Sequence, residues 1–195
     1  MRHQLWIYGL AGLILTGSAA AVTVAYQSQS SSVVAQRPMQ MGWTDQGFIE
    51  MMIPHHQDAI DMAELALKKA QHPELKTLAQ SIIQDQEREI NEMKTWYQQW
   101  FGRAVPPLST QGLMGMHQEH GMMAMDLAAL ETAQNFDREF IRQMIPHHQM
   151  AVMMASNLKT NTNRPEMEKL ADDIIRSQSA EIKQMKQWYQ AWYSH

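Results

Sequence analysis

The chain contains no cysteine among its 195 residues, although it has 18 methionines and nine histidines. A soft-metal site in this protein must therefore be built without thiols, from thioether sulfur and imidazole nitrogen. The absence of cysteine also fits an exported protein that avoids thiol oxidation. The share of methionine exceeds what gap-filling in a core normally requires, so some methionines are expected to have another role.

Long runs of charge of one sign are also absent. The 16 basic residues are outnumbered by 20 acidic residues, which gives a formal net charge of −4. Because nucleic-acid binding depends on clustered lysine and arginine, this composition excludes nucleic acid as an expected partner. The length allows one domain of moderate size, or two small domains that share a core.

The N-terminal segment has almost no charge. Arg2 is the only charged residue before Arg37, and residues 5–26 are uncharged and mostly apolar or small. This pattern is typical of an export signal, and it is also long enough to span a bilayer. Two outcomes are open: cleavage after Ala25 or Ala35, or retention as a membrane anchor. In both cases we expect the body of the protein in the periplasm or outside the cell, with membrane contact only through an uncleaved segment.

Two long segments with helical apolar spacing follow, separated by a short turn. The first is expected to be capped at Thr44 and to fade at His72, and the second to start at Pro73 and end at Gly102. A short turn between two long helices predicts an antiparallel αα-hairpin. Pro54 lies inside the first helix and is expected to kink it.

The chain contains an internal repeat. From Phe140 onward it repeats the segment that starts at Phe48, at a constant offset of 92 residues, and the sequence Ile-Pro-His-His-Gln occurs at residues 53–57 and 145–149. About half of the aligned positions are identical, which indicates a duplication. Neither hairpin can bury its apolar stripe alone, so the two are predicted to pair into an all-α four-helix bundle with a pseudo-twofold axis.

These patterns predict the following layout, in which Asn135 caps the second repeat. Residues 1–35 are a signal peptide or membrane anchor, 36–43 a flexible tether, 44–102 the first hairpin repeat, 103–134 a Met/His-rich linker with a helical stretch over residues 122–130, and 135–195 the second hairpin repeat, with 44–195 forming one bundle.

Counting from each turn predicts which side chains face each other inside a hairpin. Both helices rise equally per residue, so residues equally distant from the turn lie opposite one another. This places His56 opposite Glu89, with Met52 and Met93 beside them. The equivalent residues of the second repeat are His148, Glu181, Met144 and Met185.

Adjacent histidines on a helix point about 100° apart, so the two histidines of one motif cannot share a face. We assign His56 and His148 to the inner stripe, and His55 and His147 to the boundary of the bundle. The side chains expected near these boundary histidines are Met51, Asp58 and Met62 in the first repeat, and Gln143, Met150 and Met154 in the second. The second boundary site is therefore the softer one.

The linker between the repeats carries its own run of candidate ligands. They are Met114, Met116, His117, His120, Met122, Met123 and Met125. Loops have no packing reason to collect methionines, so this run indicates metal binding.

Thioether and imidazole ligands together favour copper, with Cu(I) preferred and Cu(II) and Ag(I) also accepted. Glu89 and Glu181 either ligate Cu(II) or orient a histidine. Readings without metal stay open: His56 and Glu89 as a satisfied polar pair, and Met93 and Met185 as core packing. The four tryptophans near the helix ends, Trp96, Trp100, Trp188 and Trp192, are interpreted as packing at the ends of the bundle.

The histidine motifs and their surroundings resemble the family called domain of unknown function 305. The matching elements are Phe48-Ile49-x-x-Met52-Ile53-Pro54-His55-His56-Gln57-x-Ala59-x-x-Met62-Ala63, Phe136-Asp137-x-x-Phe140-Ile141-x-x-Met144-Ile145-Pro146-His147-His148-Gln149-x-Ala151-x-x-Met154-Ala155, Gln86-x-x-Glu89-Ile90-x-x-Met93 and Gln178-x-x-Glu181-Ile182-x-x-Met185. The resemblance covers the chain from about residue 44 to its end. It implies a ferritin-like bundle, export, and a role in copper binding or resistance, with no catalytic activity.

The favoured hypothesis is an exported copper-binding protein that sequesters Cu(I) and hands it to an efflux system or a periplasmic metallochaperone. One alternative is a ferritin-like metal oxidase. Bundles of the di-iron kind use Glu-x-x-His, whereas Glu89 and Glu181 are followed at that spacing by Glu92 and Gln184. The other alternative is a periplasmic helical adaptor that binds no metal.

Overall fold

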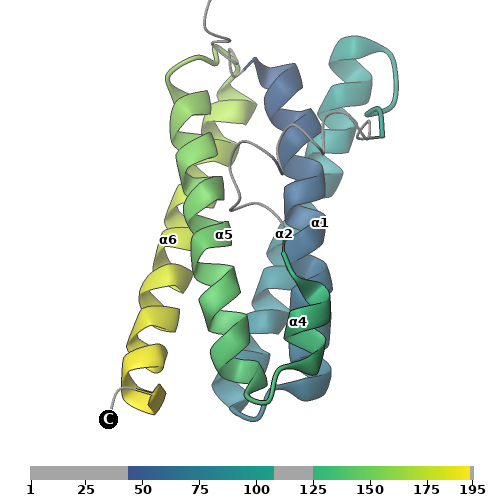
Figure 1. The fold of residues 1–195 in the computed structure, drawn as a ribbon. Helices are drawn as coiled ribbons and strands as arrows, with labels where there is room; N and C mark the ends of the chain where they lie inside the picture. The colour runs from purple at the N-terminus through teal and green to yellow at the C-terminus, as the bar shows by residue number, and fades with distance from the viewer. Residues whose placement is uncertain (1–43, 108–124, 194–195) are drawn as a thin grey trace, which may run out of the picture. The chain divides into compact units, whose positions relative to one another are not determined.

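The computed structural model describes residues 44–107 and 125–193, and it confirms the all-α fold class. The helices are α1 (Asp45–Lys69), α2 (Pro73–Phe101), α4 (Leu127–Thr132), α5 (Phe136–Lys159) and α6 (Pro165–Tyr193), shown in Figure 1. The predicted signal or anchor segment, the tether and the linker up to Ala124 lie outside the described residues. Within the ranges described, no helix is long and apolar enough to cross a membrane.

The ends of the long helices follow the local sequence signals. Thr44 Oγ1 accepts a hydrogen bond from the backbone N–H of Gly47 at 3.1 Å, and Asn135 Oδ1 accepts one from Arg138 at 3.0 Å. Each bond satisfies a backbone donor that the first helical turn leaves free. Pro73 starts α2, and Gly102 ends it in the left-handed region at φ 66°.

The two hairpins pack against each other through α1 and α5. Along the colour gradient of Figure 1, α1 and α2 run in opposite directions, as do α5 and α6, and α1 is antiparallel to α5. The predicted four-helix bundle of two duplicated hairpins is thereby confirmed. Because equivalent helices of the two repeats meet, the pseudo-twofold axis passes between α1 and α5.

The short helix of the linker starts later than predicted. A helical stretch was expected over residues 122–130, but α4 covers Leu127–Thr132, and Met125 precedes it without helical structure. The reason is a cap: Asp126 Oδ1 accepts a hydrogen bond from the backbone N–H of Ala129 at 2.8 Å, which sets the start of the helix. Lys69 Nζ also donates to the carbonyl of Glu131 at 2.7 Å and ties α4 to the end of α1.

Helices α1 and α5 continue through the proline of each histidine motif. Pro54 and Pro146 are both internal residues of unbroken helices. Each proline removes one backbone donor in the middle of a helix, directly before the paired histidines. The predicted kink stays a prediction.

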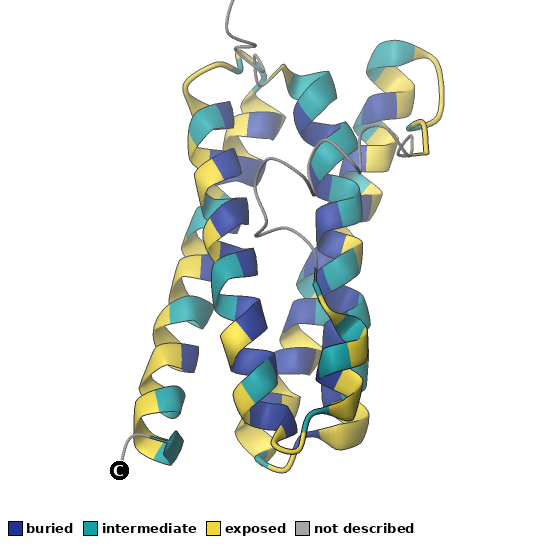
Figure 2. Ribbon diagram, viewed as in Figure 1, coloured by how far each residue is buried: buried dark blue, intermediate teal, exposed yellow. Residues whose placement is uncertain are grey.

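Buried residues line the sides of the helices that face one another, as Figure 2 shows. They form two apolar clusters, one containing Met52, Met93 and Met154, the other Met144 and Met185. The predicted pairs, Met52 with Met93 and Met144 with Met185, therefore each share a cluster. The tryptophans stack in pairs near the helix ends, Trp96 on Trp100 at 5.8 Å and Trp188 on Trp192 at 5.4 Å between ring centroids, and pack against these clusters as predicted.

Candidate metal centre

His55 and His147 meet where α1 crosses α5. Their ring centroids lie 3.7 Å apart with an interplanar angle of 31°, and both residues are buried. The prediction that placed them at two separate boundary sites is therefore wrong. Counting residues within one hairpin does not show what covers the face of the helix that carries His55 or His147. When the two repeats pack, these faces of α1 and α5 contact each other. Equivalent residues in contact are the expected consequence of a twofold relation.

The other two histidines face glutamates of their own hairpins, as predicted. His56 Nε2 lies 2.7 Å from Glu89 Oε2, and His148 Nε2 lies 2.7 Å from Glu181 Oε2. Both histidines are fully buried. Each carboxyl group holds one ring nitrogen and thereby orients the ring, an arrangement common behind histidine ligands of metals.

The two histidine pairs form one group in the centre of the bundle. Ring centroids of adjacent histidines are 6.4 Å apart in the first motif and 6.1 Å apart in the second. Together with the contact between His55 and His147, these distances connect all four rings. We call His55, His56, His147 and His148 the histidine core.

Burial keeps three rings of the histidine core, those of His55, His56 and His147, uncharged at neutral pH. It lowers the pKa of His55 and His147 well below the ordinary value, and neighbouring histidines lower both further. The pKa of His56 falls to about 3, mainly through burial and then through His148, against the opposing effect of Glu181. An uncharged imidazole has a nitrogen lone pair available, which is the form that binds a metal ion.

The pKa of Glu89 is shifted in the opposite direction. Burial raises its pKa to about 8, although the Arg88 guanidinium, 3.6 Å from Oε1, acts to lower it. His56 and Glu89 are therefore both mainly uncharged at pH 7, because burial disfavours the imidazolium as well as the carboxylate. An open pocket of about 340 Å³, lined by Glu89 and by charged residues of α2 and α6, adjoins this carboxyl group.

The histidine core has buried nitrogens without hydrogen-bond partners among the described residues. They are Nδ1 of His55, His56 and His148, and both ring nitrogens of His147. A buried polar atom left unpaired costs about 1–3 kcal/mol, so several in one place require an explanation. A soft metal ion that accepts these lone pairs would supply one, and in this respect the residues fit copper.

Among the described residues, His, Asp and Glu side chains alone do not form a complete metal site. In the part of the chain that the structure describes, no group of three or more His, Asp or Glu side chains is arranged to hold a metal ion. The two glutamates are engaged with histidine Nε2 atoms, which leaves nitrogen and thioether sulfur as the donors. This donor set favours a soft monovalent ion over a hard divalent one.

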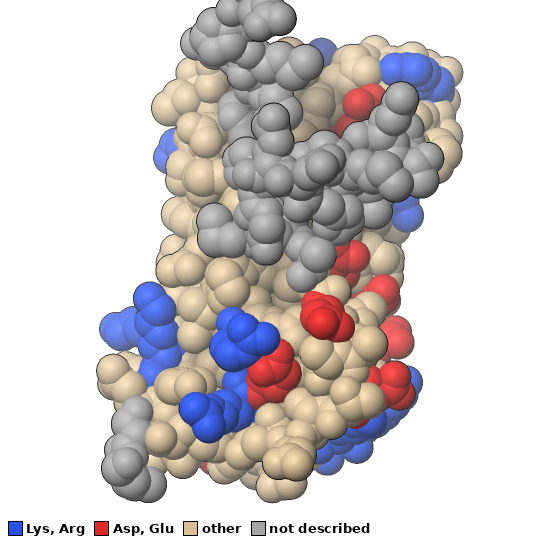
Figure 3. All heavy atoms as spheres, viewed as in Figure 1, with Lys and Arg blue, Asp and Glu red and all other residues tan. Residues whose placement is uncertain are grey.

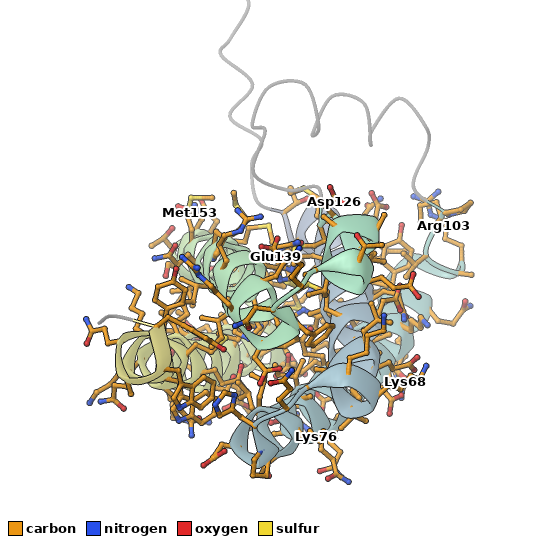
Figure 4. The ribbon with its side chains drawn as sticks, turned by 60° about the horizontal axis from the view of Figure 1, so that its bottom comes forward. Lys68, Lys76, Arg103, Asp126, Glu139 and Met153 are labelled. Atoms are coloured by element: carbon orange, nitrogen blue, oxygen red, sulfur yellow. The ribbon has the colours of Figure 1, made fainter. Side chains whose placement is uncertain are left out.

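The candidate methionines around the core differ in exposure. Met52, Met62, Met93, Met144, Met154 and Met185 are almost fully buried, Met150 is 8% exposed, and Met51 and Met125 are half-buried. Met153 is 47% exposed at the outer edge of α5, where Figure 4 labels it, and the sequence patterns did not mark it as a candidate. Of the linker candidates, Met114, Met116, His117, His120, Met122 and Met123 lie outside the described residues.

Two buried glutamines were not marked as candidate ligands. Gln86 and Gln178 lie one helical turn before Glu89 and Glu181, and their Oε1 atoms accept no hydrogen bond among the described residues. Gln143, which was expected beside His147, instead forms hydrogen bonds with the backbone of Asp126 in the linker. Its Oε1 accepts from the backbone N–H of Asp126 at 3.0 Å, and its Nε2 donates to the Asp126 carbonyl at 3.2 Å.

The face of the molecule shown in Figure 3 carries charges of both signs in its lower half. Lysines and arginines lie near aspartates and glutamates there, without a large area of one sign on the visible atoms. The buried histidines and methionines, and not this surface, are therefore the most distinctive chemical feature of the described bundle.

The solved structures that are similar to this bundle include CopM in metal-bound forms. The chain is 83% identical to CopM in a Cu(II)-bound form, with a TM-score of 0.71, over 77% of this chain and 99% of that one. It is 78% identical to CopM in a Cu(I)-bound form, with a TM-score of 0.70 and the same coverage. CopM has also been solved with bound silver, at 77% identity and a TM-score of 0.68.

Two more distant relatives also match the chain. A DUF305 fragment from Deinococcus radiodurans is 31% identical, with a TM-score of 0.61, over 73% of this chain and 92% of that one. The uncharacterized protein L153 of Acanthamoeba polyphaga mimivirus is 43% identical over 49 residues, which are 25% of this chain and 32% of that relative. The chain thus matches about a third of the length of this curated relative.

The family model described as "Domain of unknown function (DUF305)" matches residues 45–189, which include both histidine motifs and both glutamates. This match spans most of the chain and agrees with the repeat found in its sequence. The protein therefore belongs to the DUF305 family.

Proposed function

We propose that this protein is an exported copper-binding protein that sequesters Cu(I), and also takes Ag(I) and Cu(II), in copper resistance or homeostasis. The observation that carries the proposal is the histidine core, in which the rings of His55, His56 and His147 are uncharged and buried nitrogens have no hydrogen-bond partner among the described residues. Buried methionines occur in both apolar clusters of the same bundle. The CopM structures with copper and silver, at 77–83% identity, support it independently.

The chemistry of the donors explains the order of preference. Thioether sulfur is soft and uncharged, so it binds Cu(I) and Ag(I) in preference to hard cations. Imidazole nitrogen binds both Cu(I) and Cu(II). The two glutamates orient histidines through Nε2 and so leave Nδ1 free on His56 and His148.

A role in storage and transfer follows from the same donors. No catalytic step is proposed, because the glutamates are already paired with histidines and the Glu-x-x-His pattern of bundle oxidases is missing. The mature protein outside the cytoplasmic membrane would lower the free concentration of Cu(I) there. Its proposed partners are an efflux system or a periplasmic metallochaperone that takes over the ion.

The test is a Cu(I) titration of the exported form under reducing conditions, with a chromophoric chelator as competitor and elemental analysis of the isolated protein. We expect the protein to withdraw Cu(I) from the chelator and to retain it through gel filtration. Competition no stronger than that of a helical bundle with few methionines would refute copper binding. Normal copper tolerance in cells that lack the protein would refute the role in resistance.

A further inference from the structure

Each hairpin turn carries a residue that stacks on a tryptophan of the other repeat. The His72 ring lies 3.6 Å from the Trp192 ring, centroid to centroid, with an interplanar angle of only 6°. The Arg164 guanidinium carbon lies 4.0 Å from the centroid of the Trp100 ring. Both pairs occupy positions related by the offset of 92 residues, so they are equivalent contacts at opposite ends of the bundle.

A carboxylate from the start of the neighbouring helix completes each contact. His72 Nδ1 lies 2.6 Å from Asp137 Oδ2, and Arg164 Nε lies 3.0 Å from Asp45 Oδ2. The two aspartates also share the offset of 92 residues. We call His72, Asp137 and Trp192 the histidine clasp, and Arg164, Asp45 and Trp100 the arginine clasp.

The histidine clasp is the more deeply buried of the two. The Asp137 side chain is 2% exposed, against 18% for Asp45. The Asp137 oxygens also accept hydrogen bonds from the backbone N–H groups of Gln71, at 3.0 and 3.1 Å, and His72, at 2.9 Å. This carboxylate therefore fastens the whole turn between α1 and α2 to the first turn of α5.

We propose that the histidine clasp is a pH-sensitive lock on one end of the bundle, whereas the arginine clasp holds the other end at every physiological pH. An imidazole changes charge between pH 5 and 8, but a guanidinium stays charged. Protonated His72 forms a charge-assisted hydrogen bond with Asp137 and a cation–π contact with Trp192. Neutral His72 can still donate its Nδ1–H to Asp137, but it lacks the attraction between opposite charges and the cation–π contact, so acidification tightens this end alone.

The other groups around the histidine clasp do not produce the same response. Asp137 and Arg138 come from α5. Tyr193 comes from α6, and its hydroxyl donates to Asn135 Oδ1 at 3.2 Å. Lys69, from α1, is bonded to the Glu131 carbonyl of α4. Of the residue types that face the clasp, only histidine changes charge between pH 5 and 8.

The test follows the emission of Trp192 in the metal-free mature protein between pH 8 and pH 5. Subtracting the emission of the Trp192→Phe variant isolates this residue, and far-UV circular dichroism checks that the helices stay intact. Protonated histidine quenches a stacked indole, so we expect Trp192 emission to fall as the pH is lowered across this range. The His72→Arg variant copies the arginine clasp and should lose the transition.

The matched variant is Arg164→His, which introduces a histidine at the equivalent position. We expect it to gain a new transition in the emission of Trp100, obtained by subtracting the spectra of the same variant with Trp100→Phe. A Trp192 transition that persists in His72→Arg, a wild type without one, or an Arg164→His variant that gains none would each overturn the proposal. Slower exchange of the Gln71 and His72 amides at pH 5 than expected from the chemical exchange rate would support tightening, and faster exchange would contradict it.

Discussion

Burial keeps His55, His56 and His147 of the core uncharged. His56 is paired with Glu89 through Nε2, and its Nδ1 is buried without a partner among the described residues. Adding a proton to such a ring puts a charge into an apolar interior, which burial opposes. Adding a soft metal ion uses the same lone pair and gains bonds to sulfur as well, so the core is better suited to Cu(I) than to protons.

Replacing His56 and His148 by glutamine should remove the core sites and leave binding by the linker in place. Glutamine keeps a hydrogen-bonding group opposite each glutamate but has no lone pair on a ring nitrogen. Elemental analysis after competition with a Cu(I) chelator should show fewer ions retained per chain. Deleting residues 113–125 should lower the retained copper separately. A His72→Gln variant, which changes a histidine outside the core, is the control and should keep wild-type binding; unchanged stoichiometry in both test variants would contradict the site assignment.

Copper loading should release a proton from Glu89. With a pKa of about 8, this carboxyl group is mainly protonated at pH 7, whereas the lowered pKa values of His55, His56 and His147 mean that these rings have no extra proton to lose. A cation bound in the core lowers the pKa of Glu89 by direct attraction. Calorimetric Cu(I) titrations in buffers of different ionisation enthalpy measure the released protons. The Glu89→Gln variant should release fewer, and equal release by this variant and the wild type would refute the assignment.

The seam between α1 and α5 is the element that assembles the centre. It joins His55 to His147 and places Met52 and Met93 of the first repeat in one cluster with Met150 and Met154 of the second. Neither hairpin alone contains this combination of donors. Copper binding in the core should therefore depend on both repeats being present and packed.

Exchanging Met52 and Met93 for leucine should weaken Cu(I) binding without unfolding the bundle. Leucine nearly conserves the volume of methionine, and such swaps usually cost less than about 1.5 kcal/mol of stability. The sulfur donors, by contrast, are lost completely. The control is Met167→Leu, because Met167 is buried in the same cluster but is not a candidate ligand. Chelator competition and thermal unfolding of both variants give the answer; equal affinity in the two would assign Met52 and Met93 to packing.

The first hairpin shows where sequence reasoning succeeds and where it stops. His56 and Glu89 were placed opposite each other by counting from the turn, because their contact depends only on the rise of two helices joined by that turn. His55 was placed at a boundary, because nothing in one hairpin shows which face the other hairpin covers. The start of α4 was missed for a local reason: Asp126 competes as a cap with the continuing helical pattern.

At the scale of the whole molecule, the buried histidines make stability depend on pH. His55, His56 and His147 have lowered pKa values in the folded state, so their stabilisation is present above pH 6.5 and is lost as the pH falls. Glu89 has a raised pKa, so its contribution is present below pH 4.5 and is lost as the pH rises through about 8. Between pH 6.5 and 4.5 the three histidines outweigh the one glutamic acid.

The metal-free protein should therefore become less stable between pH 7 and pH 5. Three protons gained and one lost on unfolding give a net uptake of about two, which corresponds to at most ~2.7 kcal/mol per pH unit within this window. Denaturant unfolding followed by circular dichroism at pH 7, 6 and 5 measures the slope. The His72→Arg variant removes the opposing contribution of the histidine clasp. Stability of this variant that stays constant or rises on acidification would show that His55, His56 and His147 are not buried in the uncharged form. Saturating Cu(I) should stabilise the protein at each pH, because the ion binds the folded state preferentially.

Local patterns in the chain were enough to establish the duplicated hairpins, the caps at Thr44 and Asn135 and the pairing of each inner histidine with a glutamate. All of these depend on helical periodicity or on the geometry of one short turn, which nearby residues specify. The contact of His55 with His147, the uncharged state of His55, His56 and His147, and the two unequal clasps arise only when the repeats pack. The physical reason is that burial and long-range contact come from the other hairpin, whose position no local pattern encodes.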